Sequence, residues 1–336
     1  MCIAFFTLSQ PGYKLILASN RDEFLSRPTA PARWHTFSHT TSPDEDDEKE
    51  PWVLSGVDKG AVNGGTWLGI TRDLRVGLLT NVRLTPPTPP LRPSPNPPSR
   101  GLLLRDFLSN PPSSSVGVHD YLSSHYPQSG EYEGFNLLLF SLHKGKGEVG
   151  YLTNRPIPCL TELHIPSSHP TPPPAPQPCD PLKGEERKAH ELAAQCFGIS
   201  NSPMNEPWPK VLQGEKRMVD TLKQWQKGGE DDKQLIERMF GVLSQSIPIT
   251  KESDALSSTT IPLITIPSAN AFTTPTTESG QSPKPRWYGT RTSTVIIVKE
   301  NGETIFVERD VLVLDDEGNP KKGEGERWVK FKANLD

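Results

Sequence analysis

Short apolar runs that are rich in β-forming residues recur along the chain and predict strands. Residues 3–8 and 14–19 are two such runs, and the Gln-Pro-Gly at residues 10–12 between them is typical of a tight turn. We therefore expect the chain to begin with a β-hairpin. Asn-Gly at residues 301–302 predicts a second hairpin near the other end. The remaining predicted strands are residues 52–55, 66–71, 75–80, 135–142, 148–153, 293–299, 304–309 and 328–332.

Hydrophobic residues at helical spacing predict fewer helices, most of them in the middle of the chain. Val211, Met218, Leu222 and Trp225 fall on one face of a helix over residues 211–226. Strands near both ends, helices between them and no strict alternation of strand and helix favour an α+β fold with largely antiparallel sheets. The other predicted helices cover residues 101–108, 118–124, 185–196 and 232–245.

Polar and proline-rich segments interrupt this pattern. The chain has 336 residues, of which 33% are hydrophobic and 36 are prolines. Segments dominated by proline or by polar residues bury too little apolar area to offset the entropy of ordering them, so we expect mobile surface insertions. We predict one domain over residues 1–336, with flexible insertions at about residues 39–51, 85–99, 166–181 and 251–285.

Charge and cysteine spacing exclude several classes of function. The net charge is −4 and basic residues are scattered, so no nucleic-acid partner is expected. The four cysteines form no CxxC pair and have no histidine at zinc-ligand spacing, so we expect neither a metal nor a disulfide scaffold. No apolar run approaches the roughly 20 residues that span a bilayer, and the apolar start is too short for a signal peptide. We expect a soluble intracellular chain without a cofactor.

Cys2 is the strongest candidate for chemistry. Removal of Met1 would leave Cys2 as the first residue, with a thiol and an α-amine on the same residue. Their reference pKa values, about 8.5 and about 7.7–8.0, are close enough for the amine to take the thiol proton. This is the N-terminal nucleophile arrangement. The alternative is that Cys2 only begins the buried strand that follows it.

The polar cluster Asn-Arg-Asp-Glu at residues 20–23 stands where the second strand of the hairpin is expected to end. The hairpin should bring this cluster back beside Cys2. There Arg21 would stabilise the thiolate, and a carboxylate could hold the α-amine. The alternative is a surface cluster at a strand end, but four consecutive polar residues are more than a turn needs.

Amide and guanidinium side chains stand beside other predicted strands. Asn81 and Asn201 could each direct an amide N–H at a developing oxyanion, which is worth about 10²–10³ in rate. Alone, either asparagine is more often a turn residue or a helix cap. Arg291 opens the strand at 293–299, and an arginine there is more often a structural partner than a catalytic group. Trp67 is either a core residue or one wall of a pocket near Cys2.

Several longer motifs contain these residues and follow one another over nearly the whole chain. They are Met1-Cys2-Ile3 with Phe5-Phe6, residues 15–28 (LILASNRDEFLSRP), 64–70 (GGTWLGI), 79–81 (LTN), 135–137 (FNL), 198–201 (GISN) with Pro207-Trp208, and 288–292 (YGTRT). In content and order the motifs resemble those of the NRDE family, also called the transport and Golgi organisation protein 2 family. The segments between them are the proline- and serine-rich insertions.

The resemblance implies an αββα sandwich of the N-terminal-nucleophile hydrolase type. It also implies a site similar to that of cysteine acylases of the cholylglycine hydrolase and penicillin V acylase kind. In those acylases the arginine and aspartate lie three residues apart, whereas here they are neighbours, which face opposite ways on a regular strand. Either a bulge re-aims one of them or Glu23 is the working acid. The site residues implied in this way are Cys2, Arg21, Asp22, Asn81, Asn201 and Arg291.

In function, the resemblance implies a protein linked to Golgi organisation and protein secretion, with membrane-trafficking partners. It would act on or bind an acyl-type or other hydrophobic small molecule at Cys2; as an enzyme it would hydrolyse amide or thioester bonds. One alternative is a non-enzymatic carrier of lipid, acyl-CoA or haem with a relict hydrolase pocket, although no C-x-x-C-H motif supports haem. A scaffold that binds through the proline-rich segments is a third. The expected location is cytoplasmic, with Golgi or mitochondrial association as alternatives.

Overall fold

The computed structural model describes residues 2–37, 52–61, 64–83, 96–109, 116–142, 147–163, 196–266 and 286–333. The predicted insertions at residues 39–51 and 166–181 lie outside the described residues, as do the larger parts of those at 85–99 and 251–285. The helix predicted over 185–196 also lies outside them, except for Cys196, which begins a strand.

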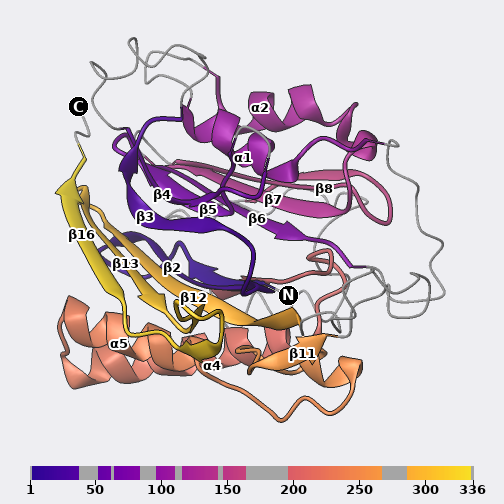
Figure 1. Ribbon diagram of the computed structural model, residues 1–336. Coiled ribbons are helices and arrows are strands. Elements are labelled where there is room, and N and C mark those ends of the chain that lie inside the picture. The colour runs from indigo at the N-terminus through magenta and orange to yellow at the C-terminus, as the bar shows by residue number, and fades with distance from the viewer. Residues whose placement is uncertain are drawn as a thin grey trace, which may run out of the picture.

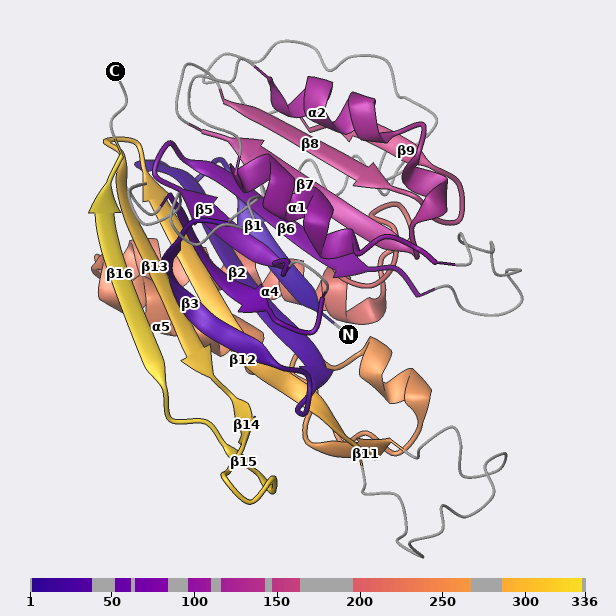
Figure 2. The same ribbon diagram turned by 45° about the horizontal axis from the view of Figure 1, so that its top comes forward.

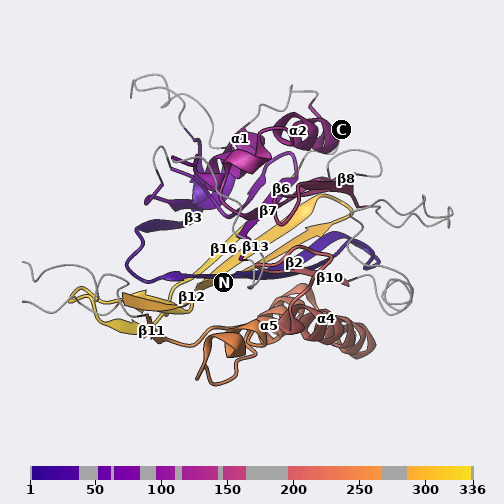
Figure 3. The same cartoon turned by 90° about the vertical axis from the view of Figure 1, so that its right-hand side faces the viewer.

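The described chain forms layers in the order helix, sheet, sheet, helix (Figure 1, Figure 3). Helices α1 (Arg100–Ser109) and α2 (Val118–His125) cover the outer face of one sheet. Helices α4 (Pro209–Gly228) and α5 (Asp232–Leu243) cover the outer face of the other. The α+β class and the αββα order of layers, both predicted above, are confirmed.

The strands make two large antiparallel sheets, and their long strands run side by side in Figure 2. The first sheet contains β1 (Ile3–Thr7), β2 (Tyr13–Phe24), β10 (Cys196–Ile199), β11 (Ile264–Ile266), β12 (Arg286–Lys299), β13 (Glu303–Asp310) and β16 (Glu326–Lys332). Its order is β10-β1-β2-β12-β13-β16, with β11 beside β12. The second sheet runs in sequence order through β3 (Thr29–His35), β4 (Val53–Asp58), β5 (Leu68–Thr71), β6 (Arg75–Asn81), β7 (Phe135–Ser141), β8 (Glu148–Thr153) and β9 (Cys159–Glu162).

Smaller elements complete the described chain. Strands β14 (Leu312–Leu314) and β15 (Pro320–Lys322) form a separate ribbon, which lies at one end of the first sheet in Figure 2. Two short 3-10 helices are η2 (Ser129–Glu131) and η3 (Glu252–Leu256). Within the part of the chain that the structure describes, no helix combines the length and apolar character needed to cross a membrane.

Apolar clusters fill the spaces between the layers. Side chains alternate along β1, so Ala4 and Phe6 face the second sheet, whereas Ile3 and Phe5 face α4. A third cluster, around Leu104 of α1, lies between the second sheet and its helices. Because β1 is buried on both faces, its start, where Cys2 lies, is held firmly between two layers.

Strand β2 continues beyond the end predicted for it and includes the polar residues 20–23, which pair with β12. The prediction that these residues follow a strand end was therefore wrong. The physical reason is that Asn20, although fully buried, is hydrogen-bonded. Its amide Nδ2 donates to the carbonyl oxygens of Leu243 and Thr259, each at 3.1 Å, and its Oδ1 accepts from Ser293 Oγ at 2.6 Å.

Residues 251–266, which we expected in a flexible insertion, lie against the first sheet. Thr259 is 2% exposed and Ile261 is fully buried. The backbone N–H of Ile261 donates to Thr290 Oγ1 of β12 at 2.8 Å. This segment differs from the expectation because its polar backbone groups find partners on β2 and β12.

Candidate active site at Cys2

Cys2 lies where the two sheets come together at the start of β1. Ser200, which follows β10, donates its hydroxyl to the backbone oxygen of Cys2 at 2.7 Å. Thr80 of β6 in turn donates its hydroxyl to the backbone oxygen of Ser200 at 2.6 Å. The Cys2 thiol is half-buried, and its Sγ is 3.9 Å from the backbone oxygen of Asp22. The hairpin thus brings residues 20–23 beside Cys2.

Arg21 lies on the face of β2 that meets the second sheet, and Trp67 covers it. The side chain is 6% exposed, and its guanidinium carbon is 4.1 Å from the centre of the Trp67 ring. A desolvated contact of this kind is worth about 2 kcal/mol. Gly56 is required here, because a Cβ at that position would stand 2.6 Å from the Trp67 ring. Trp67 therefore packs against the core and also lines the site.

Asp22 faces the opposite way, towards the helical layer, as Asn20 does. Its Oδ1 accepts a hydrogen bond from Thr290 Oγ1 at 2.6 Å. Beside these residues the pair of strands has a bulge that lies in β12, between Thr290 and Thr292, and β2 advances there one residue at a time. It therefore does not turn Arg21 and Asp22 to the same face. Glu23 shares the face of Arg21, with its Oε2 at 3.9 Å from Arg21 Nη2.

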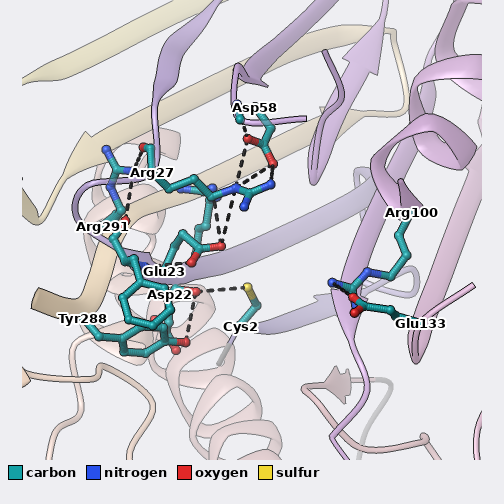
Figure 4. A network of polar contacts seen from close by, with 12 residues as sticks. Cys2, Asp22, Glu23, Arg27, Asp58, Arg100, Glu133, Tyr288 and Arg291 are labelled. Atoms are coloured by element: carbon teal, nitrogen blue, oxygen red, sulfur yellow. Dashed lines mark hydrogen bonds and ion pairs between the residues drawn. The ribbon is translucent and has the colours of Figure 1, made fainter. Parts of the chain in front are cut away.

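A network of charged groups extends from Glu23 (Figure 4). Arg27 Nη2 donates to Asp58 Oδ2 at 2.8 Å, and Arg27 Nε is 3.8 Å from Glu23 Oε2. Arg291 Nη1 donates to the backbone oxygen of Arg27 at 2.6 Å. Burial, together with the charge of Arg21, lowers the pKa of Arg291. Arg291 thus fastens β12 to the turn that follows β2.

Arg100, at the start of α1, lies on the other side of Cys2 from Arg27 in Figure 4. Its Nη2 is 3.0 Å from Glu133 Oε2, and its Nη1 donates to the backbone oxygen of Gly134 at 2.9 Å. Burial lowers the pKa of Arg100, whereas the negative charges of Glu133 and of the Cys2 thiolate raise it. The helical layer over the second sheet therefore supplies a charge near Cys2.

The charges around Cys2 act on its thiol in opposite directions. Burial raises the pKa of the Cys2 thiol, and the negative charge of Asp22 raises it further. The positive charge of Arg21 lowers it. A nucleophilic Cys2 therefore needs Arg21 and any other nearby cation to offset burial, because the thiolate is the reactive form.

Asn81 and Asn201 are brought together. Asn201 Nδ2 donates to the backbone oxygen of Asn81 at 2.7 Å. Asn201 is 3% exposed and its Oδ1 has no hydrogen-bond partner among the described residues, whereas Asn81 has an exposed side chain. Asn201 follows Ser200 directly and so lies close to Cys2. In the described ranges, no hydrogen bond joins the Asn81 side chain to Cys2.

Lys210, which lies in the first turn of α4, was not predicted from the sequence as a site residue. It is 1% exposed, and the charges of Asp22 and Cys2 both act on it. A signal was available, because Lys210, Gly214 and Met218 follow one another at intervals of four on the buried face of this helix. Four more were missed: Arg27, at the end of the motif over residues 15–28, and Asp58, Arg100 and Glu133, which lie in none of the motifs.

Comparisons with known proteins match the chain along most of its length. The model of the family described as Transport and Golgi organisation 2 matches residues 1–312. The "Transport and Golgi organization 2 homolog" of Mus musculus is 29% identical over 326 residues, which cover 94% of this chain and 95% of that protein. Among solved structures, the chain is similar to an N-acylethanolamine-hydrolyzing acid amidase ortholog of Caenorhabditis elegans, at 12% identity and a TM-score of 0.42, over 88% of this chain and 92% of that one. A mutant conjugated bile acid hydrolase of Clostridium perfringens is 10% identical with a TM-score of 0.43, over 100% and 98% of the two chains.

Proposed function

Because the chain belongs to the Transport and Golgi organisation 2 family, we propose that it acts on an acyl compound through Cys2. The reaction is hydrolysis of an amide or thioester bond, with Cys2 as an N-terminal nucleophile after removal of Met1. One observation supports this most: Cys2 lies at the junction of the two sheets with its Sγ 3.9 Å from the Asp22 backbone, beside Arg21. As part of the proposal, we extend to this chain the role in transport and Golgi organisation for which its relatives are named.

The first half of the reaction forms an acyl-enzyme. The α-amine of Cys2 accepts the thiol proton, and the thiolate attacks the carbonyl carbon of the substrate. A C–S bond forms as the carbonyl electron pair moves onto oxygen, where amide N–H groups at Asn81 and Asn201 stabilise it. The intermediate then expels an amine or a thiol, which takes the proton from the α-ammonium group. The product of this half is a thioester on Cys2.

The second half returns the enzyme to its starting state. The α-amine removes a proton from water, and the resulting hydroxide attacks the thioester carbonyl. The C–S bond breaks, the Cys2 sulfur takes back the proton, and the acyl group leaves as a carboxylic acid. Asp22 holds the α-ammonium, although it lies on the face of β2 opposite Arg21, because the Asp22 charge is the carboxylate charge that acts on Cys2. Arg21 favours the thiolate because its charge lowers the pKa of the thiol. Arg291 acts as a positioning residue, through its hydrogen bond to the turn after β2.

The test is hydrolysis of a panel of fatty-acyl amides and thioesters by protein shown to begin at Cys2. We expect turnover of at least one member, and we expect Cys2→Ala to abolish it. Cys159→Ala is the matched control, since Cys159 is also half-buried but lies on β9 at the far edge of the second sheet. Hydrolysis by Cys2→Ala at the wild-type rate would refute the proposal.

A carrier is the second candidate, and one observation favours it. Burial raises the pKa of the Cys2 thiol, which keeps the sulfur protonated and unreactive at neutral pH. A carrier would bind a fatty-acyl or porphyrin ligand without turning it over. Binding of such a ligand by Cys2→Ala with wild-type affinity, together with no hydrolysis by either protein, would favour the carrier over the enzyme.

A further inference from the structure

Lys210 is a buried amine that the reaction above does not use. Its side chain is 1% exposed, and its Nζ has no hydrogen-bond partner among the described residues. The Nζ lies 5.6 Å from the centre of the Trp208 ring. A buried amine without a hydrogen bond is costly, and a buried charge is tolerated when an opposite charge balances it. The groups whose negative charge acts on the Lys210 amine therefore indicate the role of this residue.

The close packing of α4 on the first sheet fixes the position of Lys210. A Cβ on Gly214 would overlap the Phe5 ring of β1, and a Cβ on Gly198 would stand 2.8 Å from Val211 Cγ1. Lys210 directly precedes Val211 and lies one helical turn before Gly214. The first turns of α4 therefore lie over Phe5 and its partner Gly198, on the strand that Cys2 directly precedes.

The charges that act on Lys210 come from the Cys2 site. Asp22 faces the helical layer on β2, and it and the Cys2 thiolate are the two groups whose charges raise the pKa of Lys210. Burial acts more strongly in the opposite direction and lowers the pKa of Lys210. Lys210 and Asp22 thus place a buried amine and a buried carboxyl group on the same side of Cys2.

We propose that Lys210 is a positioning residue of the Cys2 site, a buried cation that with Asp22 sets the charge around the Cys2 thiol and α-amine. The proposal rests on the proposed function to the extent that Cys2 is the nucleophile. An ammonium group near the α-amine disfavours its protonation and keeps it able to accept the thiol proton. The same ammonium stabilises the thiolate, and so offsets the effect of burial.

Other charged groups also face Cys2 and must be held constant in any test. Arg21 and Asp22 approach from β2, and Arg100 approaches from α1. Lys210, from the helical layer over the first sheet, is a basic group on whose pKa the charge of the Cys2 thiolate acts. Replacing it removes a positive charge and leaves those on the other faces of the site in place.

The test is the rate of alkylation of Cys2 by iodoacetamide across the pH range, followed peptide by peptide by mass spectrometry. We expect Lys210→Met to raise the midpoint of the Cys2 profile by about one pH unit, which slows alkylation at a fixed pH below the midpoint by about tenfold. Lys210→Arg, which keeps the charge, should bring the midpoint back towards the wild-type value. Cys159 serves as the internal reference thiol. The matched control is Lys216→Met, the same change at an exposed position of the same helix.

A Lys210→Met protein with the wild-type midpoint would overturn the proposal, as would an equal shift in Lys216→Met. Circular dichroism establishes that each variant is folded; if Lys210→Met is not, Lys210→Gln carries the same expectation with a neutral polar side chain. The titration requires no turnover, so it is separate from the proposed hydrolysis. An absence of hydrolysis with a shifted midpoint would count against the enzyme alone, and hydrolysis with an unshifted midpoint would count against Lys210 alone.

Discussion

Asn20 fastens the end of β2 to the helical layer, and its replacement by alanine is expected to destabilise the fold. The side chain is fully buried. Its Nδ2 donates to the backbone oxygen of Leu243, the last residue of α5, and to the backbone oxygen of Thr259. Ser293 Oγ of β12 donates to Asn20 Oδ1 at 2.6 Å, and Asn20 Nδ2 also donates to Thr260 Oγ1 at 3.3 Å. Arg21 and Asp22 directly follow Asn20, so the same bonds hold the candidate site in place.

The expected size of the loss follows from the groups left without a partner. In Asn20→Ala the backbone oxygen of Leu243 still accepts from Thr260 Oγ1 at 2.5 Å. The backbone oxygen of Thr259 and the Ser293 hydroxyl lose the bonds that Asn20 makes to them. A buried polar group left unsatisfied costs about 1–3 kcal/mol, so we expect the free energy of unfolding to fall by about 2–6 kcal/mol.

Urea unfolding followed by circular dichroism measures this loss. The control is Asn301→Ala, which removes the hydrogen bond of 3.0 Å that the Glu303 N–H donates to Asn301 Oδ1 in an exposed turn and should cost about 1 kcal/mol or less. The double variant Asn20→Ala with Ser293→Ala should lose less than the sum of the two single losses, because the partners share one bond. A loss within about 0.5 kcal/mol of zero, or strictly additive losses, would refute the reasoning.

Two further predictions concern the helical layer and the thiol. Gly214→Ala should destabilise the protein by about 1–3 kcal/mol because its Cβ would overlap Phe5. Gly241→Ala in α5, where no atom lies within 4 Å of the added Cβ, should stabilise it by about 0.5–1 kcal/mol. Urea unfolding measures both, and changes of the same sign in the free energy of unfolding would contradict this packing. Arg21 lowers the pKa of the Cys2 thiol, so Arg21→Met should raise that pKa by about one unit and reduce the thiolate fraction at any pH below it. The alkylation profile of Cys2 measures the shift, and an unchanged or lower midpoint would argue against Arg21 as its counter-charge.

Local patterns were enough to predict most of the regular structure. Two short apolar runs around a Gln-Pro-Gly turn predicted the first hairpin, and helical spacing predicted α4 and α5 within a few residues of their bounds. The end of β2 was missed because residues 20–23 are polar and look like the end of a strand. They continue it because Asn20 finds partners at Leu243 and Thr259, more than 200 positions away, and no local pattern reveals such partners.

The candidate site was predictable only in part. The motifs identified the family, which the family comparison confirms, and the hairpin accounts for why Cys2 and Arg21 come together. Asp58 and Arg100 were not predictable, since each becomes a neighbour of the site only through the packing of the second sheet and α1. Lys210 was predictable from its spacing before Met218, but a lysine on an apolar helix face is normally explained as a side chain that reaches solvent.

The N-terminal peptide tests the central claim most directly. Protein purified from its own cells is incubated with a fatty-acyl thioester, quenched in acid and analysed by tandem mass spectrometry. If Cys2 is an N-terminal nucleophile, the peptide begins at Cys2 with an unacetylated α-amine and carries the acyl group on that residue. A peptide that still begins at Met1, an acetylated Cys2, or a Cys2 that stays free of the acyl group while the thioester is consumed would contradict the account.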